Sequence, residues 1–120
     1  MWNIGRLEVY DKICSLVKRV YVLVRILPNE ERFALGDQMR RAVSSIRLNV
    51  QEGSGKRTSK EFASYLDNAM GSLREVRGCV SIGVDVGYFG EDVKKDVDEI
   101  LRIERLLAGY IGYVKKCDVK

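Results

Sequence analysis

A run of basic residues between Arg32 and Lys60 is the part of the sequence best suited to chemistry. It contains seven Lys or Arg residues and two Asp or Glu residues, and seven minus two gives +5, whereas the whole chain carries +4. The residues outside the run therefore sum to −1. Ammonium and guanidinium groups bind phosphates by displacing condensed counterions. A surplus confined to one segment thus predicts a polyanionic partner for that segment.

Candidates for catalysis or metal binding are few. The sequence contains no histidine, which removes the usual general base, the Cys-His nucleophile pair and the commonest metal ligand. Asp96, Glu99 and Glu104 have carboxylates that could bind a metal, but exposed acids on a helix of balanced charge explain them better. The segment from Gly53 to Lys56 lacks the spacing of a phosphate-binding loop. We therefore expect a protein that is not an enzyme and that needs no metal or cofactor.

Length and composition predict one folded domain spanning residues 1–120. Hydrophobic residues make up 46% of the chain and one proline is present, so the chain has enough apolar surface for a core and favours helices. The apolar run 20–24 is far shorter than the ~18 residues of a membrane span, and no secretory signal is visible. The three cysteines are widely spaced, which suits reduced thiols in a cytoplasmic protein.

Four stretches of the sequence have apolar residues at the three-and-four spacing of an α-helix. The turn-forming segments 28–29, 53–55 and 87–90 separate these stretches. Thr58 and Glu61 have the spacing of a capping box, which predicts the start of the third helix. Residues 80–86 alternate like a strand, but they continue the helical register of the preceding residues, so we predict a helix there. Because short connections favour antiparallel neighbours, we predict an all-α, up-down-up-down four-helix bundle with helices at about 7–27, 31–53, 59–86 and 91–116.

Residues in the basic segment and beyond it follow the order of a known signature. That signature is similar to Gln-Ile-Arg-Arg-Ala-x-x-Ser-Ile-Pro-x-Asn-Ile-Ala-Glu-Gly, then a basic turn, then Glu-Phe and Gly-Ser-Leu-x-Glu. The chain resembles, over nearly its whole length, the small four-helix proteins encoded inside intervening sequences of bacterial large-subunit (23S) ribosomal RNA genes. The matching positions are Gln38, Arg40, Arg41, Ala42, Ser45, Ile46, Asn49, Glu52, Gly53, Arg57, Glu61, Phe62, Gly71, Ser72, Leu73 and Glu75.

This resemblance implies a homopentamer, in which five bundles form a barrel around a central opening, and an association with structured RNA. The fold also resembles the accessory variability determinant of diversity-generating retroelements, a basic pentamer that binds its reverse transcriptase and the template RNA. Arg47 and Gln51 stand where the family usually has proline and alanine, and Arg77 stands where an acid is common. These departures make the retroelement role credible. A structural oligomer or an adaptor for an acidic protein is the alternative without nucleic acid.

Helical geometry places the Lys and Arg residues on several different surfaces. At 100° per residue, Arg40 and Arg47 lie about 20° apart on one flank of the second apolar stripe. With the basic turn that follows, they could form a strip that binds phosphates, although a solvated helix flank would have the same pattern. Arg77 lies about 40° from the centre of the third stripe, so it either extends the basic surface or pairs with a carboxylate of another subunit. The candidate nucleic-acid-binding residues are Arg40, Arg47, Lys56, Arg57, Lys60, Arg74 and Arg77.

Arg41 lies on the opposite flank of the second helix, in a band of polar residues that borders the core. Polar groups near a dry boundary need partners, so a network across a helix or subunit boundary is expected there in preference to a ligand site. On the third helix, small residues would allow another helix to approach closely. The candidate assembly residues are Gln38, Arg41, Ser45, Asn49, Glu52, Gly71, Ser72 and Glu75.

Overall fold

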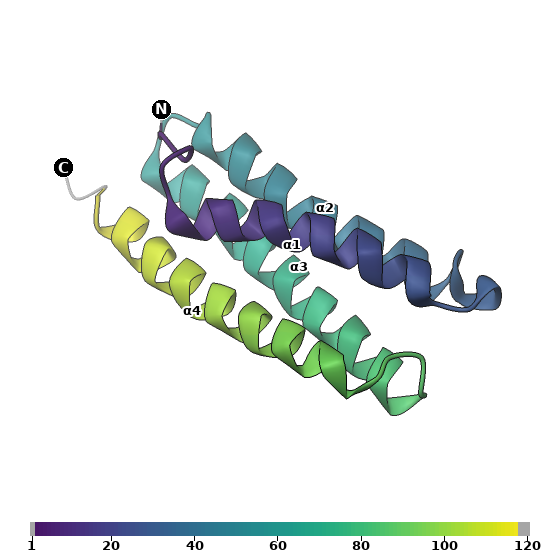
Figure 1. Cartoon of the computed structure of the whole chain (residues 1–120). Coiled ribbons are helices and arrows are strands. Elements are labelled where there is room, and N and C mark those ends of the chain that lie inside the picture. Colours follow the sequence, from purple (N-terminus) through teal and green to yellow (C-terminus); the bar gives the residue numbers. More distant parts are fainter. Residues whose placement is uncertain (1, 118–120) are drawn as a thin grey trace.

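The computed structural model describes residues 2–117. Figure 1 shows helices α1 (Glu8–Ile26), α2 (Leu35–Ser54), α3 (Ser59–Asp85) and α4 (Lys94–Lys116) running alternately in opposite directions. Two short 3-10 turns, η1 (Asn29–Glu31) and η2 (Glu91–Val93), precede α2 and α4. The described residues contain no strand. The predicted all-α four-helix bundle is confirmed.

Two helices begin later than their sequence patterns indicate. Residues 29–31 and 91–93 form 3-10 turns, so α2 begins at Leu35 and α4 begins at Lys94. A 3-10 turn has 3.0 residues per turn, which is too close to the α-helical period for apolar spacing to tell the two apart. The strand-like residues 80–86 behave as the upstream register predicts, because α3 continues to Asp85.

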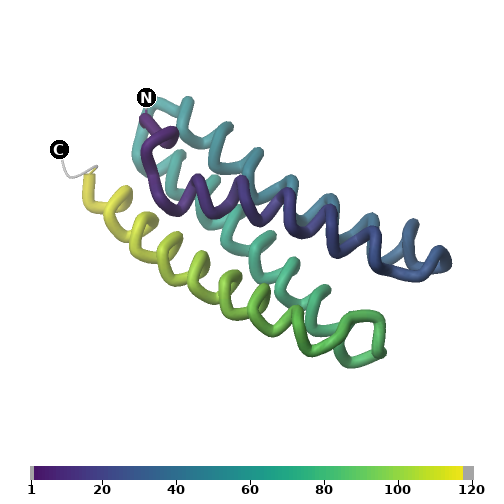
Figure 2. The backbone as a smooth tube through the Cα atoms, viewed as in Figure 1, coloured from purple at the N-terminus to yellow at the C-terminus, as the bar shows by residue number. Residues whose placement is uncertain are grey.

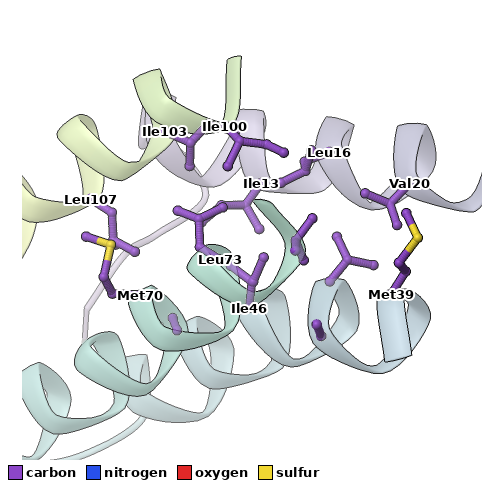
Figure 3. Close-up of a cluster of buried hydrophobic side chains, with 14 of the residues drawn as sticks. Ile13, Leu16, Val20, Met39, Ile46, Met70, Leu73, Ile100, Ile103 and Leu107 are labelled. Atoms are coloured by element: carbon purple, nitrogen blue, oxygen red, sulfur yellow. The ribbon is translucent and has the colours of Figure 1, made fainter. Parts of the chain in front are cut away.

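The core is a continuous column of aliphatic side chains from all four helices. Figure 3 shows Ile13 of α1, Ile46 of α2, Leu73 of α3 and Ile103 of α4 pointing toward one another. All four side chains are fully buried. Burying each contributes about 1.5–3 kcal/mol relative to exposure. Alignment of the four apolar stripes on this column fixes which face of each helix remains for function.

The helices do not pack on one another equally. Figure 2 traces α1 and α2 as one hairpin and α3 and α4 as a second. Among the four neighbouring helix pairs, α2 and α3 pack most extensively and α1 and α4 least. The α1–α4 seam therefore depends more on specific polar contacts than the other three seams do.

Both ends of α3 are fixed by local chemistry. At its start, the Glu61 backbone N–H donates to Thr58 Oγ1 over 3.1 Å, which is one half of the predicted capping box. The Glu61 carboxylate accepts from the Thr58 hydroxyl, also over 3.1 Å, in place of the Thr58 backbone N–H. At its end, Gly87 has a φ of 86°, a left-handed conformation that glycine adopts without strain. The chain then turns back so that the ring of Phe89 lies against Gly83, where a Cβ atom would be 2.4 Å from the ring.

Aromatic residues close the other end of the bundle. The ring centres of Trp2 and Phe62 are 5.1 Å apart, and the ring centres of Phe62 and Tyr110 are 6.0 Å apart. Tyr110 in turn stacks on Tyr113 at 6.1 Å. The Trp2 backbone N–H donates to the carbonyl of Ser54 over 3.0 Å. This aromatic cluster joins the segment before α1 to the end of α2, the start of α3 and the end of α4.

Candidate nucleic-acid interface

Two contacts define the face shared by α1 and α2. The Arg47 Nε–H donates to the Tyr10 hydroxyl over 3.3 Å, and its guanidinium carbon lies 6.0 Å from the centre of the Tyr10 ring. Further along, the hydroxyl groups of Tyr21 and Ser44 are 3.3 Å apart. These contacts set the flank of α2 that carries Arg47 beside one edge of α1.

That edge of α1 carries bases that the sequence reasoning did not select. Lys18 and Arg25 are exposed and lie three residues before and four residues after Tyr21, so they project from the same edge of the helix. Arg40 lies seven residues before Arg47 on the facing flank of α2. We call these four residues the basic strip: Lys18, Arg25, Arg40 and Arg47. Positions 10, 14, 18, 21 and 25 recur at helical spacing and so share one edge of α1. This pattern indicates a basic surface only once α2 is known to lie beside that edge.

The four charges of the basic strip are not equally available. Arg40 forms an ion pair with Asp37 and also donates to the carbonyl of Arg32 over 3.0 Å, so its charge is partly neutralised. The hydrogen bond to Tyr10 is the main cause of the raised pKa of Arg47. Arginine is charged at neutral pH in any case, and Arg47 keeps donors that its bond to Tyr10 does not use.

The basic turn between α2 and α3 lies elsewhere. Lys56 Nζ is 3.5 Å from a carboxylate oxygen of Glu52 and 5.3 Å from the centre of the Tyr65 ring. Both partners put Lys56 on the α3 side of α2, whereas Arg47 lies on the α1 side. Tyr65 is the main cause of the raised pKa of Lys56. With the exposed bases Arg57 and Lys60, this turn forms a second basic surface, and the single strip expected from the sequence is divided in two.

Arg77 is committed to a partner within its own chain. Its Nε–H donates to Glu104 Oε2 over 2.5 Å and its Nη2 donates to Glu104 Oε1 over 3.2 Å. Arg74 Nε lies 3.7 Å from the same carboxylate. The expected partners were a phosphate or a carboxylate such as Glu75 of another subunit. The bidentate pair with α4 instead makes Arg77 a link between α3 and α4, and of the two arginines Arg74 retains more freedom.

The three acids considered as exposed carboxylates of α4 are, in contrast, interhelical partners. Asp96 is 8% exposed and accepts two hydrogen bonds from Arg19 of α1, over 2.9 and 3.0 Å. Glu99 pairs with Lys12 of α1 over 3.2 Å. The expectation of exposed acids was wrong for Asp96 and Glu104, whose side chains are 10% and 12% exposed in the seams of α4 with α1 and α3, whereas Glu99 is 43% exposed. Among residues 2–117, no cluster of His, Cys, Asp or Glu could hold a metal.

The polar band of α2 is satisfied partly by α3 and partly within α2 itself. Gln38 Nε2 donates to Glu75 Oε2 over 3.3 Å, and the Ser72 hydroxyl donates to Ser45 Oγ over 2.9 Å. The Asn49 amide donates to the Ser45 carbonyl and hydroxyl, over 2.9 and 3.0 Å. These residues form a seam between α2 and α3, so they do not require a second subunit for satisfaction.

The α2–α3 face also carries exposed side chains outside the polar band, some apolar and some charged. Arg41 is exposed, and no hydrogen bond or ion pair within residues 2–117 involves it; it lines a shallow hollow with Gln38, Ser45, Ser72 and Glu75. A Cβ atom added at Gly71 would meet no atom within 4 Å, so this glycine lies on open surface. Large apolar side chains are also exposed on this face: Phe33 (80%), Leu48 (62%), Ile82 (51%) and Val86 (56%).

The comparison with known families agrees with the residue order noted in the sequence. A model of the 23S rRNA-intervening sequence protein family matches residues 5–109. The chain belongs to this family. The matched span contains the basic strip, the polar band and the whole of α1, α2 and α3. No curated protein matches the sequence.

This member of the 23S rRNA-intervening sequence protein family also has a similar solved structure. It is a protein of unknown function from the S23 ribosomal protein family of Bacteroides thetaiotaomicron. The TM-score is 0.79 at 23% sequence identity, and the match covers 86% of this chain and 97% of that chain. At this identity the likeness shows the fold alone. Among residues 2–117, no helix has both the length and the apolar character needed to cross a membrane.

Proposed function

We propose that this protein is a non-enzymatic, oligomeric accessory protein that binds RNA, with the basic strip as its principal phosphate-binding surface. The observation that carries the proposal is the strip itself, in which two antiparallel helices present Lys18, Arg25, Arg40 and Arg47 along one face. Asp37 is the acid that pairs there, and it engages Arg40. Rows of Lys and Arg side chains on neighbouring helices match the regularly spaced phosphates of a nucleic-acid backbone.

Assembly is the second part of the proposal. The α2–α3 face exposes large apolar side chains beside Arg41, whose charge has no partner in the described chain. Large apolar side chains exposed together with polar groups on one face favour a contact with another protein. We infer that another copy covers this face, and the resemblance to the intervening-sequence family favours a pentamer. Several copies would multiply weak phosphate contacts by multivalency.

The RNA-binding proposal is tested by removing charge from the strip. Lys18, Arg25 and Arg47 are replaced together by glutamine, and a matched control replaces the exposed α4 bases Lys95, Arg102 and Arg105, so that both variants lose three charges. The strip variant is expected to lose affinity for RNA at ~100 mM salt, and the slope of log affinity against log salt should fall by about 0.7 for each lost contact. Equal losses in both variants would mean that net charge, and not this face, governs binding.

A protein partner is the alternative role for the same chain. The resemblance to the accessory determinant of diversity-generating retroelements makes a reverse transcriptase a proposed partner, which would contact the apolar α2–α3 face in place of another copy. Co-purification with the reverse transcriptase after RNase treatment tests this role directly. If the strip variant retains full RNA affinity, RNA binds on another surface; if the wild type binds no RNA, the protein adaptor becomes the better description.

A further inference from the structure

Tyr21 is an exposed aromatic residue within the basic strip. It lies between Lys18 and Arg25 on α1, and its side chain is 38% exposed. Its hydroxyl group lies 3.3 Å from Ser44 Oγ of α2. A ring anchored at its hydroxyl and partly open to solvent has little conformational freedom left to lose when a ligand covers it.

Tyr21 differs in this respect from Tyr10, the other tyrosine of the α1–α2 face. The ring of Tyr10 already carries the guanidinium of Arg47, at 6.0 Å from its centre. Within residues 2–117, no aromatic pair and no cation–π contact includes Tyr21. Tyr21 is therefore the ring on this face that is free to accept a new stacking partner.

We propose that the RNA bound on the basic strip is an unpaired strand and that Tyr21 stacks on one of its bases. This inference rests on the proposed RNA-binding function. Packed helix axes lie about 8–10 Å apart, so a single strand laid along the α1–α2 face can be reached by basic side chains from both helices. Aromatic rings interleaved with basic side chains are the usual platform for single strands.

A duplex would not use the same features. In A-form RNA the bases are paired and stacked inside the helix, and the narrow major groove admits no side chain. A duplex on the strip would contact Lys18, Arg25 and Arg47 through phosphates alone, and Tyr21 would have no base to cover. The contribution of the tyrosine ring thus separates the two forms of RNA.

The test compares an RNA of about 12 nucleotides, within the range of single-strand sites, with the same RNA annealed to its complement. Tyr21→Leu keeps an apolar side chain and removes the ring, whereas Tyr21→Phe keeps the ring. Tyr113→Leu is the matched control, because Tyr113 is a 59% exposed tyrosine on α4. Thermal melting followed by circular dichroism verifies that each variant folds.

Tyr21→Leu is expected to weaken binding of the single strand on the order of tenfold and to leave duplex binding unchanged. Tyr113→Leu should bind the single strand as the wild type does, and Tyr21→Phe should bind it more tightly than Tyr21→Leu because it keeps the ring and loses only the hydroxyl anchor. Equal binding of both RNAs, with no effect of Tyr21→Leu, overturns the inference while the strip can still bind phosphates. Parallel loss of both RNAs in Tyr21→Leu also overturns it, because the ring would then only support the strip. Full binding of both RNAs by the triple strip variant contradicts the strip as the phosphate-binding surface, and absence of RNA binding by the wild type contradicts the RNA-binding function itself.

Discussion

Arg19 of α1 and Asp96 of α4 form a bidentate ion pair, with the Nε and Nη2 groups of the arginine donating to the two carboxylate oxygens over 2.9 and 3.0 Å. This hydrogen bonding is the main cause of the raised pKa of Arg19. The pair lies on the α1–α4 seam, where helix packing is least extensive. Its two parallel bonds fix both the separation and the register of these helices.

Replacing Asp96 by Asn is expected to destabilise the fold by about 1–2 kcal/mol. Breaking a fully buried pair costs about 3–5 kcal/mol, but the arginine side chain is 34% exposed and can turn toward water. Urea unfolding of the variant measures the change. Glu99→Gln is the control, because Glu99 makes one contact with Lys12 and is 43% exposed; its cost should stay below about 1 kcal/mol. A larger loss for Glu99→Gln would contradict this ranking of the two pairs.

Gly83 and Gly78 should respond to alanine in opposite directions. A Cβ atom at Gly83 would lie 2.4 Å from the Phe89 ring, whereas one at Gly78 would meet nothing within 4 Å. Gly83→Ala should therefore cost roughly 1–3 kcal/mol through overpacking. Gly78→Ala should gain up to about 1 kcal/mol by removing backbone freedom within a helix. Thermal melting of the two variants gives both signs, and stabilisation by Gly83→Ala would mean that Phe89 does not lie against α3 in solution.

Arg41 and Arg47 should separate assembly from RNA binding. Arg41→Ala removes an exposed charge from the α2–α3 face, so the fold should keep its stability while the oligomer weakens. Arg47→Ala removes a base of the strip, so the oligomer should persist while RNA affinity falls. Light scattering after size-exclusion chromatography and an RNA titration read the two effects separately. Dissociation of the oligomer by Arg47→Ala, with only RNA binding lost in Arg41→Ala, would reverse the two faces.

Cys79 should be far less reactive than Cys117. Cys79 is buried and Cys117 is exposed, and neither forms a disulfide. Burial raises the pKa of the Cys79 thiol, so its reactive thiolate is disfavoured in the folded chain. The free energy of unfolding should therefore fall as the pH rises above the ordinary thiol pKa of 9.0, because the unfolded chain then ionises Cys79 more readily than the folded chain does. Mass spectrometry after brief alkylation near pH 8 should find Cys117 modified first, and equal labelling of the two thiols would contradict a closed core.

The fold could be predicted because its signals are local. Apolar spacing, the Thr58 and Glu61 capping box and the turn-forming segments specify the helices without reference to any other part of the chain. The helix starts were less accurate, since a 3-10 turn and the first turn of an α-helix give similar apolar spacing.

The candidate sites were harder to predict because each depends on which helices are neighbours. Lys18 and Arg25 join the basic strip only once α1 lies beside α2, and Asp96 and Glu104 find their partners only once α4 lies between α1 and α3. Helical periodicity predicts on which face of its own helix a residue lies, but it does not predict which residue of another helix that side chain contacts. The assignment of Arg77 to a phosphate or to another subunit missed Glu104 for this reason.

The position of Trp2 makes the protein its own fluorescence probe. Trp2 is the one tryptophan of the sequence, and its indole packs on Phe62 within the aromatic cluster at one end of the bundle. Its emission wavelength therefore reports the solvent exposure of the indole at that end alone, whereas circular dichroism averages over all four helices. If the emission shifts at a lower urea concentration than the helical signal, this end opens before the rest and unfolding has more than two states.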